Sequence, residues 1–220
     1  MCELFAMSSR YPTSVGFSLE TLARRGGHDG PHKDGWGVAY FEGHDVFLLR
    51  ESSPAAESGL VKFMEKNGPP SNLVLSHVRL ATQGEPALRN TQPFQRELAG
   101  RAHVFAHNGN TPGIKDACCL DSNRFTPIGD TDSEFAFCCL LERLEELWDG
   151  AAERAPSVES RLEIVADFAA QLRPLAHSIS SILTVTRFLL IHTGGPREMA
   201  LSVRQACTCS RVQAMSGPSI

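Results

Sequence analysis

The sequence lacks any long hydrophobic run. Its longest apolar stretch, ILTVTRFLLI, is too short to span a bilayer and contains Arg187. The amino terminus also lacks the basic segment followed by an apolar segment that is typical of a secretory signal. We therefore expect a cytoplasmic protein with no membrane partner.

Basic clusters are absent as well. The chain has 21 Lys and Arg against 25 Asp and Glu, which gives a formal net charge of −4. A nucleic-acid-binding domain usually gathers basic residues into a patch, so we expect no nucleic-acid partner. There are no internal repeats or low-complexity linkers, and 220 residues fit one domain or at most two small ones.

Cysteine spacing of the metal-binding type is also missing. Cys207 and Cys209 form C-x-C without a second pair, and the cysteines at 118–119 and 138–139 are direct neighbours. Neighbouring thiols point in different directions, which is a poor layout for a disulfide framework or a zinc site. We expect reduced thiols and no metal, with a redox or metal protein as the weaker alternative.

The local patterns predict short strands early in the chain and long helices in its middle. Short β-branched or aromatic segments bounded by turn residues predict strands at 2–7, 36–41, 45–50, 73–81 and 102–107. Glycine stops predict short helices at 18–27 and 55–68. Longer helices are expected from a Thr131/Glu134 capping box to Gly150, and from Ser157 to Pro174. This order indicates an α+β layered fold.

A cysteine at position 2 has chemical significance if Met1 is removed. Cys2 would then carry a free α-amine beside its thiol, and an amino-terminal amine can serve as the base for such a nucleophile. The alternative interpretation of Cys2 is a buried apolar residue of the first strand.

Four further stretches combine glycines with polar residues at the ends of predicted strands. They are RGGHDGPHKDGWGVAYF, SHVRLATQGEPALRNTQPF, AHNGN and GDTDSE. Together with MCELFAMS they resemble, in order and spacing, the glutaminase domain of class II glutamine amidotransferases, which are N-terminal nucleophile hydrolases. The resemblance covers roughly residues 2–175, is greatest to the stand-alone YafJ-like group, and implies a four-layer αββα sandwich.

Hydrolysis of an inert amide needs a nucleophile, a base and donors for the oxyanion. Cys2 and its amine supply the first two. By resemblance, the oxyanion donors are the side chain of Asn108 and the backbone N–H of Gly109. The alternative is that Asn-Gly is only a hairpin turn.

The resemblance also assigns the two ends of an amino-acid substrate. Arg79 would bind the α-carboxylate, for which a guanidinium fork is well suited, and Asp132 would bind the α-ammonium. In isolation, Arg79 could form a surface salt bridge and Asp132 could simply begin a helix.

Neighbouring residues complete the pattern. By resemblance, Asp34, Trp36 and Gly37 pack beside the nucleophile. Thr82, Gly84 and Glu85 resemble the loop that follows the carboxylate-binding arginine. Larger members of the family tend to have Trp-Ala-Thr-His where this chain has LATQ, so Leu80 alters the rim of the pocket.

These motifs predict an amidohydrolase that cleaves the γ-amide of glutamine or of a γ-glutamyl compound through a Cys2 thioester. No cofactor is expected. Cleavage would release ammonia or an amine. Released ammonia could be a hydrolytic product or could pass to an acceptor subunit, and the sequence leaves both open. The alternative is a non-catalytic binding or regulatory module with the same fold.

The carboxy-terminal part departs from the resemblance. We expect an amidotransferase domain at 2–181 and a divergent tail at 182–220, such as a frameshift or alternative transcript would produce. Residues 182–192 could form one strand, and the remainder shows neither strand alternation nor a capped helix. An incomplete sheet would leave open edges, which predicts poor stability and weak activity.

Overall fold

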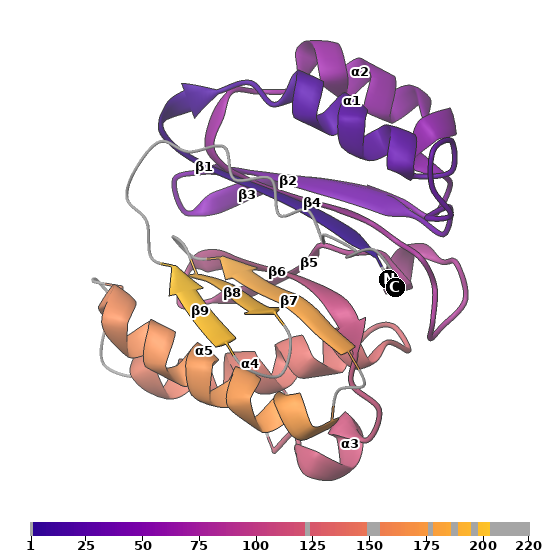
Figure 1. Cartoon of the computed structure of the whole chain (residues 1–220). Coiled ribbons are helices and arrows are strands. Elements are labelled where there is room, and N and C mark those ends of the chain that lie inside the picture. The colour runs from indigo at the N-terminus through magenta and orange to yellow at the C-terminus, as the bar shows by residue number, and fades with distance from the viewer. Residues whose placement is uncertain are drawn as a thin grey trace.

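The computed structural model describes residues 2–121, 124–148, 155–175, 178–185, 189–194 and 198–202, the last three ranges as backbone only. Figure 1 shows four layers. Two helices cover one sheet, a second sheet lies against the first, and two longer helices cover the outer face of the second sheet. This is the αββα sandwich that the sequence analysis expected.

The first sheet has the strand order β1-β4-β2-β3, and its strands are antiparallel. Its outer face is covered by α1 (Gly16–Arg25) and α2 (Gly59–Asn67). The short 3-10 helix η1 (Ala55–Glu57) follows β3 in the sequence and precedes α2. The strands are β1 (Glu3–Thr13), β2 (Trp36–Glu42), β3 (Asp45–Glu51) and β4 (Ser71–Val78).

The second sheet has the order β5-β6-β7-β8-β9, again antiparallel. Its strands are β5 (Phe94–Leu98), β6 (Arg101–Asn110), β7 (Ser178–Val185), β8 (Leu189–Gly194) and β9 (Glu198–Ser202). The helices α4 (Asp132–Trp148) and α5 (Val158–Leu172) cover it. Short helical segments are η2 (Leu88–Asn90), α3 (Ile114–Ala117) and η3 (Arg173–Leu175).

Side-chain caps fix where the long helices begin. The Thr131 hydroxyl accepts a hydrogen bond from Glu134 N at 3.2 Å, and the Ser157 hydroxyl accepts one from Ser160 N at 3.0 Å. These caps satisfy backbone N–H groups that have no partner inside the helix. The Glu134 carboxylate does not complete a reciprocal capping box, because it accepts from Gly129 N and pairs with Arg96 at 2.5 Å.

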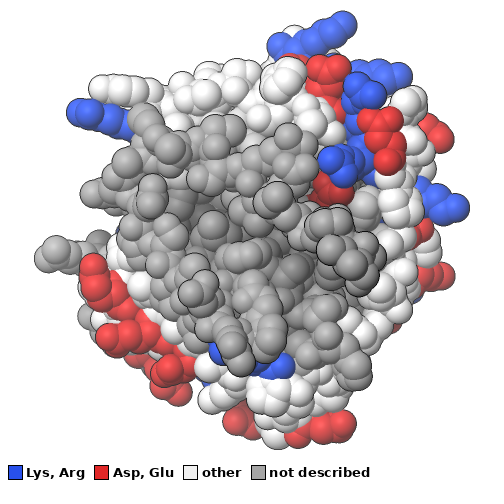
Figure 2. Space-filling view, in the orientation of Figure 1, with Lys and Arg blue, Asp and Glu red and all other residues white. Residues whose placement is uncertain are grey.

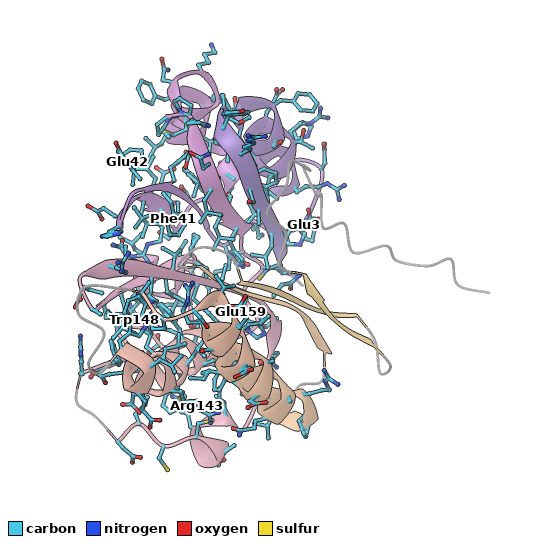
Figure 3. All side chains as sticks on the ribbon, turned by 90° about the vertical axis from the view of Figure 1, so that its left-hand side faces the viewer. Glu3, Phe41, Glu42, Arg143, Trp148 and Glu159 are labelled. Atoms are coloured by element: carbon cyan, nitrogen blue, oxygen red, sulfur yellow. The ribbon has the colours of Figure 1, made fainter. Side chains whose placement is uncertain are left out.

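Three apolar clusters hold the layers together. One lies between the first sheet and α1 and α2, and the largest lies between the second sheet and α4 and α5. Figure 3 shows Trp148 in this lower layer and Phe41 beside the junction of the two sheets. The junction itself is filled by small and medium side chains, namely Ala39, Leu73, Leu75, Val104 and Ala106.

The structure contains a strand at each early segment predicted from the sequence, and a helix at each of the four predicted positions. It differs in the carboxy-terminal part, where the expectation of a single strand within 182–192 is wrong. Three strands, β7, β8 and β9, continue the second sheet from the edge of β6. Pairing with neighbouring strands can outweigh a weak local pattern, which is why these strands were missed.

None of the helices in the described part of the chain is long and apolar enough to cross a membrane. On the face seen in Figure 2, Lys and Arg side chains lie beside Asp and Glu and form no continuous basic patch among the described residues.

Candidate active site

The Cys2 side chain lies at the start of β1, against the end of β4. Its Sγ accepts a hydrogen bond from Leu80 N at 3.3 Å and lies 3.5 Å from Leu80 O. The antiparallel pairing of Glu3 with Val78 brings these two segments together. The first strand of the chain thus places the thiol beside the loop that follows Arg79.

The thiol of Cys2 is protonated more readily than an ordinary cysteine. Burial raises its pKa and Asp34 adds to the rise, whereas the N–H of Leu80, the charged amino terminus and Arg79 lower it. A raised pKa means that little thiolate forms spontaneously at neutral pH. A nucleophilic role for Cys2 therefore requires a base.

Asn108 is in direct contact with the residue that bears the thiol. Its Nδ2 donates to the backbone oxygen of Cys2 at 2.6 Å. The register of β6 against β7 shifts at this point, because Asn108 pairs with Ser181 and Gly109 pairs with Ile179. Such bulges redirect backbone and side-chain groups and often lie next to active sites.

Arg79 is 3% exposed and its guanidinium contacts the loop that follows it. Nη2 donates to the carbonyls of Gln83 at 2.7 Å and Gly84 at 3.0 Å, and Nη1 donates to the carbonyl of Glu85 at 3.0 Å. All of these acceptors are neutral. Burial lowers the pKa of Arg79, while Cys2 and Asp34 raise it.

Asp132 is 7% exposed at the first residue of α4. Its Oδ2 accepts from the backbone N and the hydroxyl of Thr111 at 2.5 and 3.0 Å, and its Oδ1 accepts from Ser133 N at 2.8 Å. Thr111 directly follows β6. The carboxylate is therefore fixed to the end of the strand that carries Asn108 and Gly109.

A contact between Gln83 and Asn110 closes a ring around the site. Gln83 Nε2 donates to Asn110 Oδ1 at 2.8 Å, which joins the loop after Arg79 to the end of β6. The ring then runs from Asn110 along β6 to Asn108, from Asn108 to Cys2, and from Cys2 to Leu80. All five predicted site residues lie on this ring or are bonded next to it.

Arg79 and Asp132 are the two buried charges of the site. Among the residues whose side chains are described, no ion pair includes Arg79 or Asp132. Hydrogen bonds from neutral groups reduce but do not remove the free-energy cost of burying a charge. One cation and one anion are therefore available to a ligand that carries both opposite charges.

Asp34 holds the loop beside the thiol. Its Oδ2 accepts from Ala81 N at 2.7 Å, and its backbone N donates to Arg79 O at 3.1 Å. Trp36 is buried and donates to Glu51 Oε2 at 2.9 Å. A Cβ on Gly37 would lie 2.5 Å from Gln92 O, so this position requires glycine. Asp34 thus holds the loop after Arg79, while Trp36 and Gly37 begin the neighbouring strand β2.

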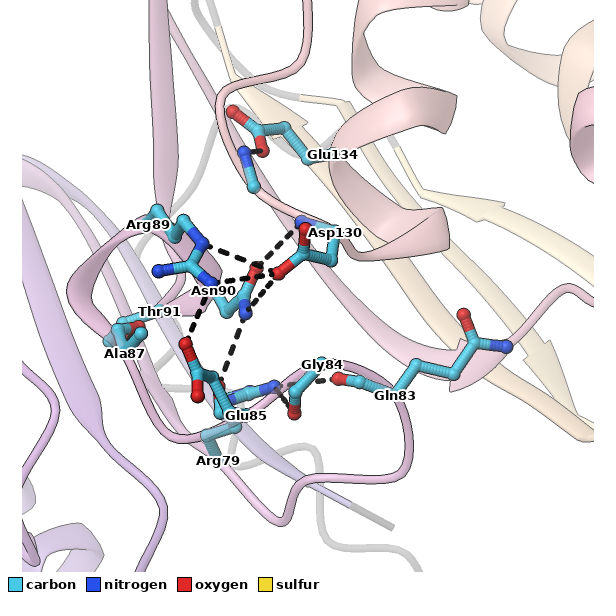
Figure 4. A network of polar contacts seen from close by, with 11 residues as sticks. Arg79, Gln83, Gly84, Glu85, Ala87, Arg89, Asn90, Thr91, Asp130 and Glu134 are labelled. Atoms are coloured by element: carbon cyan, nitrogen blue, oxygen red, sulfur yellow. Dashed lines mark hydrogen bonds and ion pairs between the residues drawn. The ribbon is translucent and has the colours of Figure 1, made fainter.

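Asn90 connects the two loops that bear Arg79 and Asp132. In Figure 4 its amide lies between Glu85 and Asp130. Nδ2 donates to Glu85 O at 3.1 Å and to Asp130 Oδ2 at 3.2 Å, and Oδ1 accepts from Asp130 N at 2.8 Å. Arg89 pairs with Glu85 and Asp130 above it. This fully buried amide fixes the spacing of the two loops.

No group of His, Cys, Asp and Glu side chains within the described residues has the arrangement of a metal site. A surface hollow of about 510 Å³ lies elsewhere, along β3, and contains none of the predicted site residues. It is lined by Val46, Phe47, Leu48, Leu49, Arg50, Leu88 and Gln95.

The structure brings the predicted residues Cys2, Asn108, Gly109, Arg79 and Asp132 to one place at the junction of the two sheets. Sequence reasoning did not identify Gln83, Asn90, Asn110, Thr111 and Ser133. Their importance lies in contacts between side chains far apart in the sequence. Only their position inside the polar motifs could have indicated it.

Comparison with known proteins gives consistent matches. The family model described as glutamine amidotransferases class-II matches residues 1–210. YafJ of Escherichia coli K12, whose name assigns it provisionally to the glutamine amidotransferases, is 41% identical over 167 residues, which are 76% of this chain and 64% of YafJ. The chain thus spans less than two thirds of that relative.

Two solved structures share the fold. A crystal structure of a predicted glutamine amidotransferase from Pseudomonas aeruginosa PA01 is 33% identical with a TM-score of 0.59, covering 87% of this chain and 72% of that one. The allosteric regulatory enzyme of purine biosynthesis is 19% identical with a TM-score of 0.52, covering 87% of this chain and 37% of that one.

Proposed function

Because this chain belongs to the class-II glutamine amidotransferases, we propose that it hydrolyses the γ-amide of glutamine or of a γ-glutamyl compound through a thioester on Cys2. The observation that carries this proposal is a pair of buried charges beside the ring of contacts that includes Cys2. Arg79 precedes Leu80, Asp132 is bonded to Thr111 at the end of β6, and no ion pair among the described side chains includes either of them. An amino acid presents one carboxylate and one ammonium, which match these two charges.

In the first half of the reaction, the α-amine of Cys2 removes the proton from the thiol after removal of Met1. The thiolate then attacks the γ-carbonyl carbon. The α-amine has an ordinary pKa of about 8, so it is a suitable base near neutral pH. In the chain that still carries Met1, burial raises the pKa of the Cys2 thiol, so the buried thiol needs a base to become nucleophilic.

The tetrahedral intermediate carries a negative charge on the former carbonyl oxygen. Asn108 and the N–H of Gly109 are its proposed donors, and the contact of Asn108 with Cys2 supports this assignment. Collapse of the intermediate breaks the C–N bond, and the protonated α-amine gives its proton to the leaving ammonia. Water then attacks the thioester, which releases glutamate and restores the thiol.

An acceptor for the ammonia is a further possibility within this proposal. In that case a protein partner would receive the ammonia after it leaves the site. Plain hydrolysis requires no such partner. The two are distinguished by whether ammonia release from the purified chain is already fast without an added acceptor.

The experiment is an assay of glutamate release together with release of ammonia from glutamine, or of the corresponding amine from each member of a panel of γ-glutamyl amides. The mass of the amino terminus should be measured on the same sample, since a retained Met1 would block the amine base. Equal release of both products that disappears in Cys2→Ala and Cys2→Ser supports the proposal. Unchanged turnover in Cys2→Ala would refute it, and selective binding without turnover would favour a non-catalytic module.

A further inference from the structure

A buried polar cluster lies where β6 ends and α4 begins. It consists of His107, Thr111, Asp132 and Ser133, none of which is more than 7% exposed. Buried apolar side chains on β6 and α4, including Phe105, Ala106 and Phe137, lie on the same two elements, together with the buried polar side chains of Asn108 and Glu134. Polar groups in such a place must satisfy one another, so their hydrogen bonds determine where each side chain points.

The Ser133 hydroxyl stands between His107 and Asp132. His107 Nδ1 lies 3.0 Å from Ser133 Oγ, and Ser133 Oγ lies 3.4 Å from Asp132 Oδ1. A carboxylate only accepts hydrogen bonds. If the hydroxyl donates its single proton toward Asp132, its oxygen accepts from His107, which then carries its proton on Nδ1.

This direction leaves the charge of Asp132 intact. Burial lowers the pKa of His107 to about 4, so the imidazole is neutral at pH 7 although Asp132 lies close enough to oppose that shift. A neutral donor chain orients the carboxylate without neutralising it. Thr111 holds the other oxygen in the same way, through its N–H and its hydroxyl.

We propose that Ser133 and His107 are positioning residues that hold the Asp132 carboxylate for the α-ammonium of the substrate. They thereby make the site selective for compounds with a free α-amine. This inference rests on the proposed function, since it assumes an amino-acid substrate. An amino group that is acylated or missing leaves Asp132 buried without a cation, so such compounds bind weakly.

The test compares glutamine with glutaramate, which is glutamine without its α-amine. Both dissociation constants are measured by calorimetry in the Cys2→Ala chain, where turnover cannot consume the ligand. We expect this parent to prefer glutamine. Adding Ser133→Ala should reduce the preference by roughly tenfold, as is typical when a hydrogen bond to a charged group is lost, and should leave glutaramate binding unchanged.

Matched variants separate positioning from damage to the fold. Ser133→Thr keeps the hydroxyl and should keep the preference. His107→Asn retains an N–H close to the position of Nδ1 and should keep more of it than His107→Leu. Thermal melts establish that each variant is folded before its affinity is compared.

The outcomes are distinct. The proposal is overturned if Ser133→Ala leaves the preference unchanged, or if it weakens both ligands equally. Ammonia release by the chain with Cys2 intact is measured in parallel. No release together with a Ser133-dependent preference would refute the proposed reaction but support the positioning role. Ammonia release together with a glutamine preference that does not change in Ser133→Ala would support the proposed reaction but refute the positioning role.

Discussion

At the scale of single residues, Asn108 is the side chain whose role separates chemistry from binding. Its Nδ2 donates a hydrogen bond to the backbone oxygen of Cys2, the residue that bears the thiol. We expect Asn108→Ala to lower kcat by about a hundred- to a thousandfold, which is the usual loss for one oxyanion donor, with a smaller change in KM. Steady-state kinetics with glutamine measure this. A change confined to KM would contradict the oxyanion assignment.

Arg79 is expected to act differently, because its guanidinium both carries a charge and ties down its own loop. Arg79→Ala should weaken substrate capture by about 2–5 kcal/mol, since one charge of the substrate is left buried and unpaired. Arg79→Lys should recover little, because an ammonium cannot bridge the carbonyls of residues 83–85 as a planar fork does. The ratio of kcat to KM for the two variants measures this. Full recovery by lysine would show that only charge matters here.

The residues that carry charge or nucleophilicity could be located from the sequence, because a polar motif at the end of a predicted strand is visible there. The residues that hold them could not. Asn90 is fully buried and is hydrogen-bonded to residues 5 and 40 positions away in the sequence. The residues next to it in the sequence do not indicate these contacts. Side-chain contacts over such separations follow from the packing of the two sheets, not from local pattern.

At the scale of elements, the loop before α4 packs closely against the segment that follows β4, at Gly129. A Cβ on Gly129 would lie 2.4 Å from Asn90 Oδ1 and 2.6 Å from Arg89 O. We expect Gly129→Ala to destabilise the protein by about 1–3 kcal/mol. For a chain of this size, that lowers Tm by roughly 2–12 °C. Differential scanning calorimetry tests this.

Gly59 provides the matched control for that substitution. It lies in α2, and a Cβ there would meet no heavy atom of the described residues within 4 Å, apart from its chain neighbours and the backbone of its own helix. Gly59→Ala should leave Tm unchanged or raise it slightly, since alanine favours helix and restricts the unfolded chain. Equal effects of the two substitutions would show that the approach of Gly129 to Asn90 does not matter for stability.

The elements themselves divide by the strength of their local signal. The first strands and the capped helices have clear periodicity or end signals, and they could be predicted. β5 is short and follows a loop rich in polar residues, and β7, β8 and β9 depend on the free edge of β6. Strand formation there is decided by partners, which a sequence pattern does not display.

At the scale of the whole molecule, buried neutral histidines make stability depend on pH. Burial lowers the pKa of His77 to about 3 and those of His103 and His107 to about 4. The unfolded chain binds protons at a pKa of about 6.5, so between these values it binds more protons than the folded chain. Stability is therefore complete above about pH 6.5 and falls with decreasing pH toward the folded values.

The expected loss between pH 7 and pH 5 is at most about 2 kcal/mol for each histidine, because the folded forms hold no proton in this range. Urea unfolding at both pH values measures it. His103 does not belong to the ring of contacts around the site. His103→Gln should therefore reduce the change in unfolding free energy between pH 5 and pH 7 by about the contribution of one histidine. A free energy of unfolding that is flat between pH 5 and pH 7 would show that these imidazoles reach solvent.

The last prediction concerns the carboxy-terminal part, where the sequence suggested a domain limit between residues 181 and 182. In the structure this point lies inside β7, whose residues 182–185 pair with His107, Ala106, Phe105 and Val104 of β6. Removing residues 182–220 would leave that part of β6 without its hydrogen-bonded neighbour. We therefore expect the chain that ends at 181 to aggregate or to melt well below the 220-residue chain, and to lose turnover because β6 carries Asn108 and Gly109.

The comparison also decides the earlier expectation of low stability, which assumed that the tail supplies no strands beyond one. A cooperative melt of the 220-residue chain that is lost on truncation would show that residues 182–220 stabilise the second sheet. Equal melting and turnover of the two chains would instead support an amidotransferase domain that ends near residue 181. Circular dichroism melts and ammonia release, measured on both chains at one protein concentration, separate these outcomes. A melt that is lost on truncation shows that β6 depends on pairing with β7, whereas equal melts show that it does not.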